Sequence, residues 1–168
     1  MADATDALLR AAALGVVAGM RSQLPLALLS LSAQRHGRNQ QGPPDILASP
    51  KVTALLLACA AGELVADKLP FTPSRLLPGS LMARAGIGSL AGALLARKHD
   101  QPPACGAALG AVGALAGSYA GHDLRAGLGA ATRLPDPLLA LLEDATAVAI
   151  GGYAVGLTGQ PGLEGATR

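Results

Sequence analysis

The sequence predicts an all-α protein, an integral membrane bundle of about five transmembrane helices whose first helix is open to a break at Pro25. Long windows rich in Ala, Leu and Gly carry few charges, and only 14% of all residues are charged, against about 25% in a typical soluble domain. Sustained alternation of apolar and polar residues, which indicates strands, is absent. At 168 residues we expect a single helical membrane domain, with a soluble Ala-rich bundle as the less favoured alternative.

The first helix is expected over residues 6–32, although a proline lies inside it. Pro25 lies well inside it, shortly after the polar residues Arg21, Ser22 and Gln23. Proline removes an intrahelical hydrogen bond and frees a carbonyl about one turn earlier. Such a break is tolerated in a membrane where the backbone faces protein or a wet cavity. These residues therefore mark the expected site of a helix break.

Prolines and polar turns delimit the other helices, which are expected over residues 49–69, 80–97, 104–122 and 137–157. Pro50 lies at the start of the second helix, and Pro70 stops it. A polar turn at residues 98–103 separates the third helix from the fourth. The fourth is uncharged from residue 104 to residue 121, which is long enough for a span candidate. The Gly-rich tail over residues 158–168 is expected to be flexible.

The fourth helix carries a series of glycines at short, regular spacing. They are Gly106, Gly110, Gly113, Gly117 and Gly121. Small residues four positions apart let helix backbones approach closely inside a membrane. We therefore expect this stripe to be a helix-packing face.

Charged residues interrupt the apolar windows at Arg21, Glu63, Asp67, Glu143 and Asp144. On insertion scales a charged side chain at bilayer depth costs about 2.5–3.5 kcal/mol, so it usually survives because it serves a function. At about 1.5 Å per residue, Glu63 lies about 20 Å along the second helix and Glu143 about 9 Å along the fifth. These helices would run in opposite directions across a core of about 30 Å, which places both acids in one layer.

Arg21 would lie about 22 Å along the first helix, above that acidic layer, and its long side chain can reach partway down. We expect it to pair with Glu63 or Glu143, with Asp67 and Asp144 nearer the water. Three interpretations stay open for these groups. They form a transport path that binds an ion or exchanges protons, or a structural ion pair that fixes helix register, or charges that snorkel to the interface.

A second polar cluster, His122, Asp123 and Arg125, follows at the expected end of the fourth helix. Charges are inexpensive at a helix end, so solvated capping is favoured over a binding role.

Several functional classes lack support in the sequence. No GxxxxGK[ST], HExxH or GxSxG motif occurs, so we assign no catalytic residue and no cofactor. Cys59 and Cys105 lie singly in apolar runs, and no metal site or disulfide is expected. A net charge of +2 and an aromatic content of 2% provide neither the electrostatic footprint nor the stacking platforms of a nucleic-acid-binding protein.

Four segments together resemble the bacterial DUF4126 family of small membrane proteins. They are residues 19–26 (GMRSQLPL), 48–50 (ASP), 62–70 (GELVADKLP) and 141–144 (LLED). The most specific part is the run from Glu63 to Pro70, and the resemblance covers about residues 13–149. It implies an integral-membrane helical protein, but it lends no substrate, cofactor or catalytic residue.

The expected function is a small integral membrane transporter or channel-like permease for an ion or small polar solute, in the lipid bilayer of the bacterial inner membrane. The alternative is a non-transporting scaffold or accessory subunit that assembles through the Gly-rich helix faces. A lipid-modifying membrane enzyme is less favoured, because no nucleophile–base pair is visible.

The distribution of positive charge bears on assembly. Apart from Arg21, Lys and Arg divide equally between the two sides of the expected bundle, so the positive-inside rule gives no orientation. We expect a homo-oligomer, with a dimer favoured and an antiparallel dimer permitted. An inverted repeat that relates the first two helices to the last two is a further hypothesis.

Overall fold

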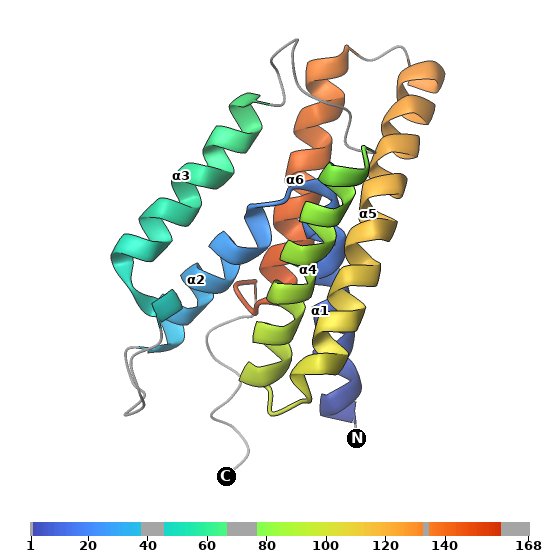
Figure 1. Ribbon diagram of the computed structural model, residues 1–168. Coiled ribbons are helices and arrows are strands. Elements are labelled where there is room, and N and C mark those ends of the chain that lie inside the picture. The colour runs from blue at the N-terminus through green and yellow to red at the C-terminus, as the bar shows by residue number, and fades with distance from the viewer. Residues whose placement is uncertain (1, 38–45, 67–76, 133–134, 159–168) are drawn as a thin grey trace.

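A computed structural model describes residues 2–37, 46–66, 77–132 and 135–158, and every regular element within these ranges is a helix (Figure 1). The elements are α1 (Ala2–Met20), α2 (Leu24–Gly37), the short 3₁₀ helix η1 (Ile46–Ala48), α3 (Pro50–Ala66), α4 (Pro78–Lys98), α5 (Pro103–Thr132) and α6 (Asp136–Ala154). The predicted all-α class is confirmed.

Helices α1, α4 and α5 form the tightly packed centre of the molecule (Figure 1). α4 and α5 are antiparallel, because Gly92 lies against Gly106 and Gly88 lies against Gly110. A Cβ atom added at Gly88 would lie 2.6 Å from the Gly110 carbonyl oxygen, well inside van der Waals contact. Glycine at these positions therefore allows the two backbones to touch.

The other side of the same α5 stripe packs on α1, which runs parallel to α5. A Cβ atom added at Gly113 would overlap the carbonyl oxygen of Ala12, and one added at Gly117 would overlap that of Val16. Gly121 lies beyond this contact, where an added Cβ would be 3.3 Å from a glutamate oxygen of α6. All five glycines of the stripe are buried, so it faces other helices of this chain.

The expected break in the helix predicted over residues 6–32 is confirmed. α1 ends at Met20 and α2 begins at Leu24, so the break falls at residues 21–23, just before Pro25. Pro25 becomes the second residue of α2, where a missing N–H removes no intrahelical hydrogen bond. Its side chain is fully buried.

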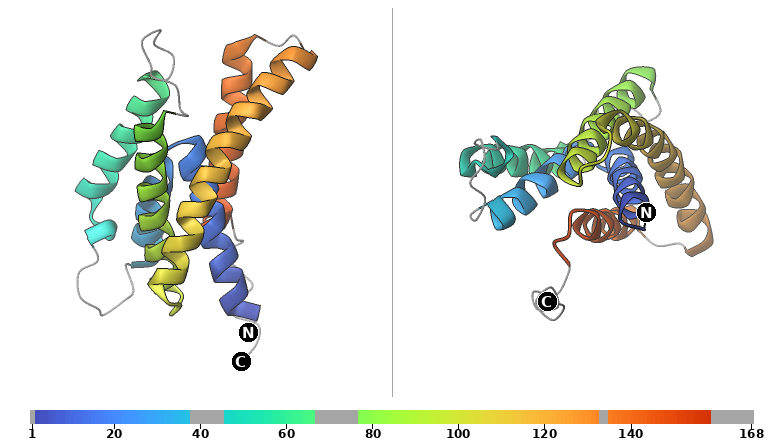
Figure 2. Two further views of the ribbon diagram at one scale, coloured as in Figure 1. Left: turned by 45° about the vertical axis from the view of Figure 1, so that its right-hand side comes forward. Right: turned by 90° about the horizontal axis from the view of Figure 1, so that it is seen from below.

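Beyond the break, α2 turns away from the central helices, and α3 returns alongside it (Figures 1 and 2). Among the described elements, α3 packs on α2 and η1. Ser30 of α2 donates a 2.5 Å hydrogen bond to the Leu47 carbonyl oxygen and shares a 2.7 Å hydrogen bond with Thr53 of α3. Gln34 donates to the same Thr53 hydroxyl at 2.5 Å. Polar contacts thus join the two arms of this apolar hairpin.

Exposed apolar side chains and two buried arginines mark the described part of the chain. Large apolar side chains are exposed on the outer helices, among them Met82 at 76%, Val65 at 65% and Leu141 at 62%. Arg21 and Arg84 are buried, with 3% and 7% of their surface exposed. In a soluble protein arginine is almost never so deeply buried unless it is paired, so the partners of these two residues define the polar interior.

Two described segments, Pro78–Lys98 and Pro103–Leu124, are long and apolar enough to cross a membrane, judged on length and composition alone. The five predicted spans are therefore not confirmed. α5 also continues to Thr132, past its predicted end at residue 122, because no proline interrupts it before Pro135. The predicted inverted repeat is not supported. It would relate α5 to the first predicted helix, but that helix is divided into α1 and α2, whereas α5 is unbroken.

Candidate functional site

The break between α1 and α2 leaves two helix ends in the interior. The Arg21 N–H donates the last hydrogen bond of α1, to the Val17 carbonyl oxygen at 2.7 Å. The N–H groups of Ser22 and Gln23 precede α2 and need acceptors from outside the helix. The carbonyl groups at the end of α1 need donors in the same way, and the two ends carry opposite partial charges.

Glu63 of α3 supplies the acceptors for the start of α2. Its Oε1 atom accepts hydrogen bonds from the Ser22 N–H and the Ser22 hydroxyl, both at 2.8 Å. Its Oε2 atom accepts from the Gln23 N–H at 2.9 Å. A carboxylate is thus bound by three donors at the amino end of a helix, where the helix dipole also favours negative charge.

Arg84 of α4 supplies the donors for the end of α1. Its Nη1 atom donates to the Gly19 carbonyl oxygen at 2.7 Å and to that of Ala18 at 3.5 Å. Its Nε atom lies 3.4 Å from the Ser80 hydroxyl, and its Nη2 atom lies 3.6 Å from Glu63 Oε1. Each helix end therefore faces a charge of the opposite sign, and the two charges face one another.

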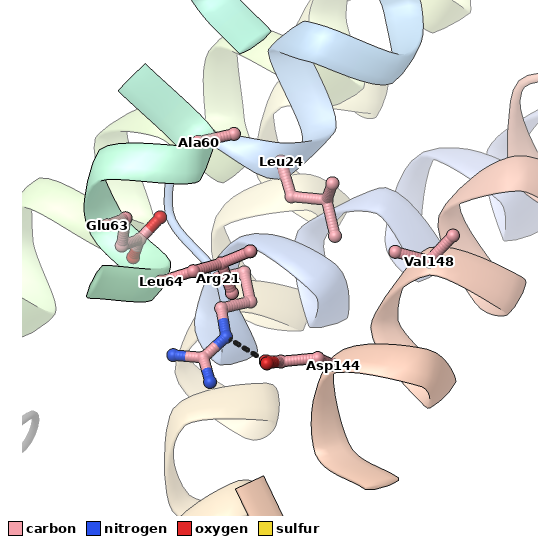
Figure 3. Close-up of a pocket in the computed structure, with 7 residues that line it drawn as sticks. All are labelled: Arg21, Leu24, Ala60, Glu63, Leu64, Asp144 and Val148. Atoms are coloured by element: carbon pink, nitrogen blue, oxygen red, sulfur yellow. Dashed lines mark hydrogen bonds and ion pairs between the residues drawn. The ribbon is translucent and has the colours of Figure 1, made fainter. Parts of the chain in front are cut away.

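Arg21, the first residue of the break, connects it to α6. Its Nε atom donates to Asp144 Oδ1 at 2.5 Å, with side-chain exposures of 4% and 20% (Figure 3). Asp144 was expected nearer the water, and this is corrected, because it pairs with Arg21. Glu63 forms an ion pair with Arg84, and the pairing of Arg21 with Glu143 stays a prediction.

A pocket of about 40 Å³ adjoins the break, between α3 and α6 (Figure 3). Its lining comes from these two helices and the start of α2. The lining residues are Arg21, Leu24, Ala60, Glu63, Leu64, Asp144 and Val148. A space of this size holds a few water molecules or one small ion. The pocket therefore presents three charged groups within otherwise apolar walls.

The other predicted site residues lie elsewhere. Glu143 is half-buried beside Gly121 of α5 and does not line the pocket. Asp67 lies outside the described residues. His122 and Asp123 are exposed within α5, so their predicted place at a helix end is wrong, and the Arg125 side chain lies outside the described part.

Sequence reasoning missed Arg84, which carries as much of this site as Arg21. A signal was present, because Arg84 lies inside the apolar window of α4, as Arg21 lies inside that of the first predicted helix. Arg84 lies near the predicted start of its own helix at residue 80, where a charge is inexpensive. The capping roles of Glu63 and Arg84 were also missed, since no sequence spacing connects them to the break.

The family model described as Domain of unknown function (DUF4126) matches residues 8–158, which is most of the chain. This match confirms the resemblance to that family, which the sequence showed over about residues 13–149. No curated protein and no solved structure matches the chain.

Proposed function

The chain belongs to the DUF4126 family, and we propose that it is a small membrane transporter or channel-like permease for an ion or small polar solute. The path would pass the pocket beside the break. The observation that carries this proposal concerns Glu63. Its carboxylate accepts hydrogen bonds from the N–H groups that precede α2, and the residue also lines the pocket.

The apolar exterior supports a membrane location. Large apolar side chains are exposed on α3, α4, α5 and α6, while Arg21 and Arg84 are buried. Water is a poor solvent for such a surface, and hydrocarbon is a good one. A multi-pass location in the cell membrane, and a homo-oligomeric assembly there, form part of the proposal.

The broken helix supports a path through the protein. Non-helical backbone at membrane depth is tolerated where it is buried in protein or lines a wet cavity. Many small transporters bind ions and substrates at such interrupted helices, whose ends supply partial charges and free hydrogen-bonding groups. In this chain the interruption at residues 21–23 adjoins a pocket whose largely apolar lining includes Arg21, Glu63 and Asp144.

Each charged residue has a distinct role in the proposal. Glu63 binds the solute or exchanges protons, and Arg21 positions the solute and balances the acids. Asp144 holds Arg21 at the wall of the pocket. Glu143, next to Asp144 on α6, contributes further negative charge.

The rival proposal is a non-transporting membrane scaffold. The glycine stripe of α5 is engaged with α1 and α4, so partners would have to use another surface. α3 offers one, because Leu55 and Val65 are exposed at 63% and 65% and the helix packs only on α2 and η1 among the described elements.

Flux through reconstituted vesicles separates the two proposals. Purified protein in liposomes is tested with protons, K⁺, chloride and acetate, using a pH-sensitive dye and radiolabelled ions. Transport predicts flux that falls at least about tenfold in Glu63→Gln, equivalent to about 1.4 kcal/mol, and stays unchanged in the control His122→Ala. Flux that is indistinguishable from empty vesicles with every probe, with complexes lost in α3 variants, would favour the scaffold.

A further inference from the structure

The chain reverses direction at the break between α1 and α2 (Figure 1). The Arg10 guanidinium, early in α1, lies over the ring of Tyr153 near the end of α6, 5.2 Å from the ring centroid. The Ser32 hydroxyl, late in α2, donates a 2.8 Å hydrogen bond to the carbonyl oxygen of Val155, which follows α6. The start of α1 and the end of α2 therefore lie at the same end of the molecule.

Two more helices reach this end. Lys98, the last residue of α4, donates from its Nζ atom to the Ser32 hydroxyl at 3.0 Å. α3 begins here as well, because Gln34 of α2 donates to the hydroxyl of Thr53 in the first turn of α3 at 2.5 Å. The end of the bundle that contains the α4–α5 turn thus also gathers the start of α1, the end of α2 and the start of α3.

The exposed charges at this end are mostly positive. Asp6 and Asp100 are the acidic side chains among the described residues there, and Asp6 pairs with Arg10 at 2.6 Å. Exposed basic side chains come from the end of α2, the start of α3 and the end of α4. We name them the basic surface; they are Arg35, Lys51, Arg97 and Lys98.

Towards the opposite end the balance is reversed among the side chains that the structure describes. The cations there, Arg21 and Arg84, are buried in ion pairs. Acidic side chains are exposed or half-buried on α5 and α6, namely Asp123, Glu143 and Asp144. The two ends of the bundle therefore present opposite charge to their surroundings.

The reversal at the break also changes the count of positive charges on which membrane orientation depends. The equal division expected from the sequence treated residues 6–32 as one crossing, which put Arg10 on the side opposite Lys98. In the structure Arg10 and Lys98 lie at the same end. Because cytoplasmic segments of membrane proteins carry an excess of Lys and Arg, the corrected arrangement favours this end as the cytoplasmic one.

We propose that the basic surface contacts the anionic phospholipid headgroups of the cytoplasmic leaflet and holds the protein in one orientation, with the α4–α5 turn inside the cell. The inference rests on the proposed membrane location, and it goes beyond transport because it names a partner and a direction. Anionic headgroups fit because they attract Lys and Arg side chains placed next to the membrane surface. A single orientation excludes the antiparallel dimer that the sequence permitted.

Lipid preference tests the partner. The full chain is reconstituted in phosphatidylcholine vesicles with a trace of spin-labelled phosphatidylglycerol or phosphatidylcholine, and the share of motionally restricted label is measured. The wild type should restrict more phosphatidylglycerol, and a triple variant, Arg35→Gln with Lys51→Gln and Arg97→Gln, should lose most of this difference. Lys98 is left intact because it contacts Ser32. An undiminished difference in the triple variant, or none in the wild type, would overturn the inference.

A control of opposite sign is available at the same end. Asp100→Asn removes a negative charge from the α4–α5 turn and should increase the share of restricted phosphatidylglycerol. Asparagine tolerates the left-handed backbone of this residue, whose φ is 54°, so the fold should be retained. A decrease in restricted phosphatidylglycerol in this variant would contradict an electrostatic contact.

Thiol labelling in bacterial spheroplasts tests the orientation. The background carries Cys59→Ala and Cys105→Ala, because both native cysteines are exposed. Gln101→Cys, in the α4–α5 turn, should be protected from a membrane-impermeant maleimide until the cells are lysed. Gly127→Cys, about 36 Å along α5 at a position where an added Cβ meets nothing within 4 Å, should react in intact spheroplasts. The reversed pattern, or reaction of both variants in intact spheroplasts, would overturn the inference.

Vesicle flux distinguishes a failure of this inference from a failure of the proposed function. A single orientation with a preference for phosphatidylglycerol, but without flux of any probe, would retain the inference and reject transport. Flux from a protein that inserts in both orientations would retain transport and reject the inference. Recovery of the chain in the soluble fraction after cell lysis would reject both.

Discussion

Glu63 and Arg84 lie on opposite sides of the break between α1 and α2, with Arg84 Nη2 3.6 Å from Glu63 Oε1. The carboxylate faces the N–H groups that begin α2, and the guanidinium faces the carbonyl groups that end α1. Each charge opposes the dipole of the helix end that it faces. Two side chains from other helices thus satisfy backbone groups that the interruption would otherwise leave without partners.

Removing one member of this pair should destabilise the protein strongly. Arg84→Met leaves a carboxylate without its cation, and Glu63→Gln leaves a buried cation beside a neutral amide. Breaking a buried pair in this way typically costs about 3–5 kcal/mol, and removing both members should cost less than the sum of the two single changes. The free energy of unfolding in bicelles, measured for both single variants and the double variant, checks this. Strict additivity would show that the two side chains act independently.

The pair of Arg21 and Asp144 should behave as a second, separate unit. Reversing either charge alone places two like charges next to one another at a site where the Arg21 side chain is 4% exposed, so each single reversal should lower the melting temperature. The double reversal should recover part of that loss. Asp123→Asn, on an exposed face of α5, serves as the neutral control. Single reversals that melt with the wild type would contradict a stabilising role for this pair.

Glycines that touch a neighbouring backbone should not tolerate a methyl group. Gly110→Ala would force its Cβ into the Gly88 backbone, and overpacking of this kind typically costs about 1–3 kcal/mol. Gly86→Ala on the exposed side of α4 meets nothing within 4 Å and should be neutral or stabilising, because alanine is the better helix former. Comparison of the two unfolding free energies checks the α4–α5 contact. Equal effects would mean that the helices do not pack through these glycines.

The pKa of His99, at the turn between α4 and α5, should depend on the charges of its neighbours. Partial burial, followed by Lys98 and Arg10, holds the pKa of His99 below its usual 6.5, and Asp6 and Asp100 oppose this shift. The unfolded chain then binds more protons at this residue, so the contribution of His99 to stability falls as the pH drops through 6.5 towards its folded pKa. Lys98→Gln should raise the pKa of His99, measured by NMR titration, while Lys51→Gln on α3 should not. An unchanged His99 pKa in Lys98→Gln would contradict this reading.

Most helix positions were predictable because their signals are local. Pro50, Pro78 and Pro103 begin α3, α4 and α5, close to the predicted starts of these helices. The interruption was expected near Pro25, but its place at residues 21–23 depends on where Glu63 and Arg84 can reach the two helix ends. Glu63 and Arg84 come from helices that follow later in the chain. Their separation from the break in sequence does not indicate that they approach it in space.

The membership of the site was predictable only in part. Arg21, Glu63 and Asp144 stood out as charges inside apolar windows, and the structure brings them to one pocket. Arg84 had the same signal but lay closer to an expected helix end, where charge is inexpensive. Depth along a helix indicates which charges share a layer, whereas the choice of partner depends on how each helix is rotated about its axis.

A crystal structure grown in a lipid phase tests the central claim most directly, by locating the Glu63 carboxylate and the contents of the pocket. The account predicts the carboxylate on the Ser22 and Gln23 N–H groups, with ordered water in the pocket beside the Arg21–Asp144 pair. An unbroken helix through residues 21–23, or a pocket filled by apolar side chains, would contradict it.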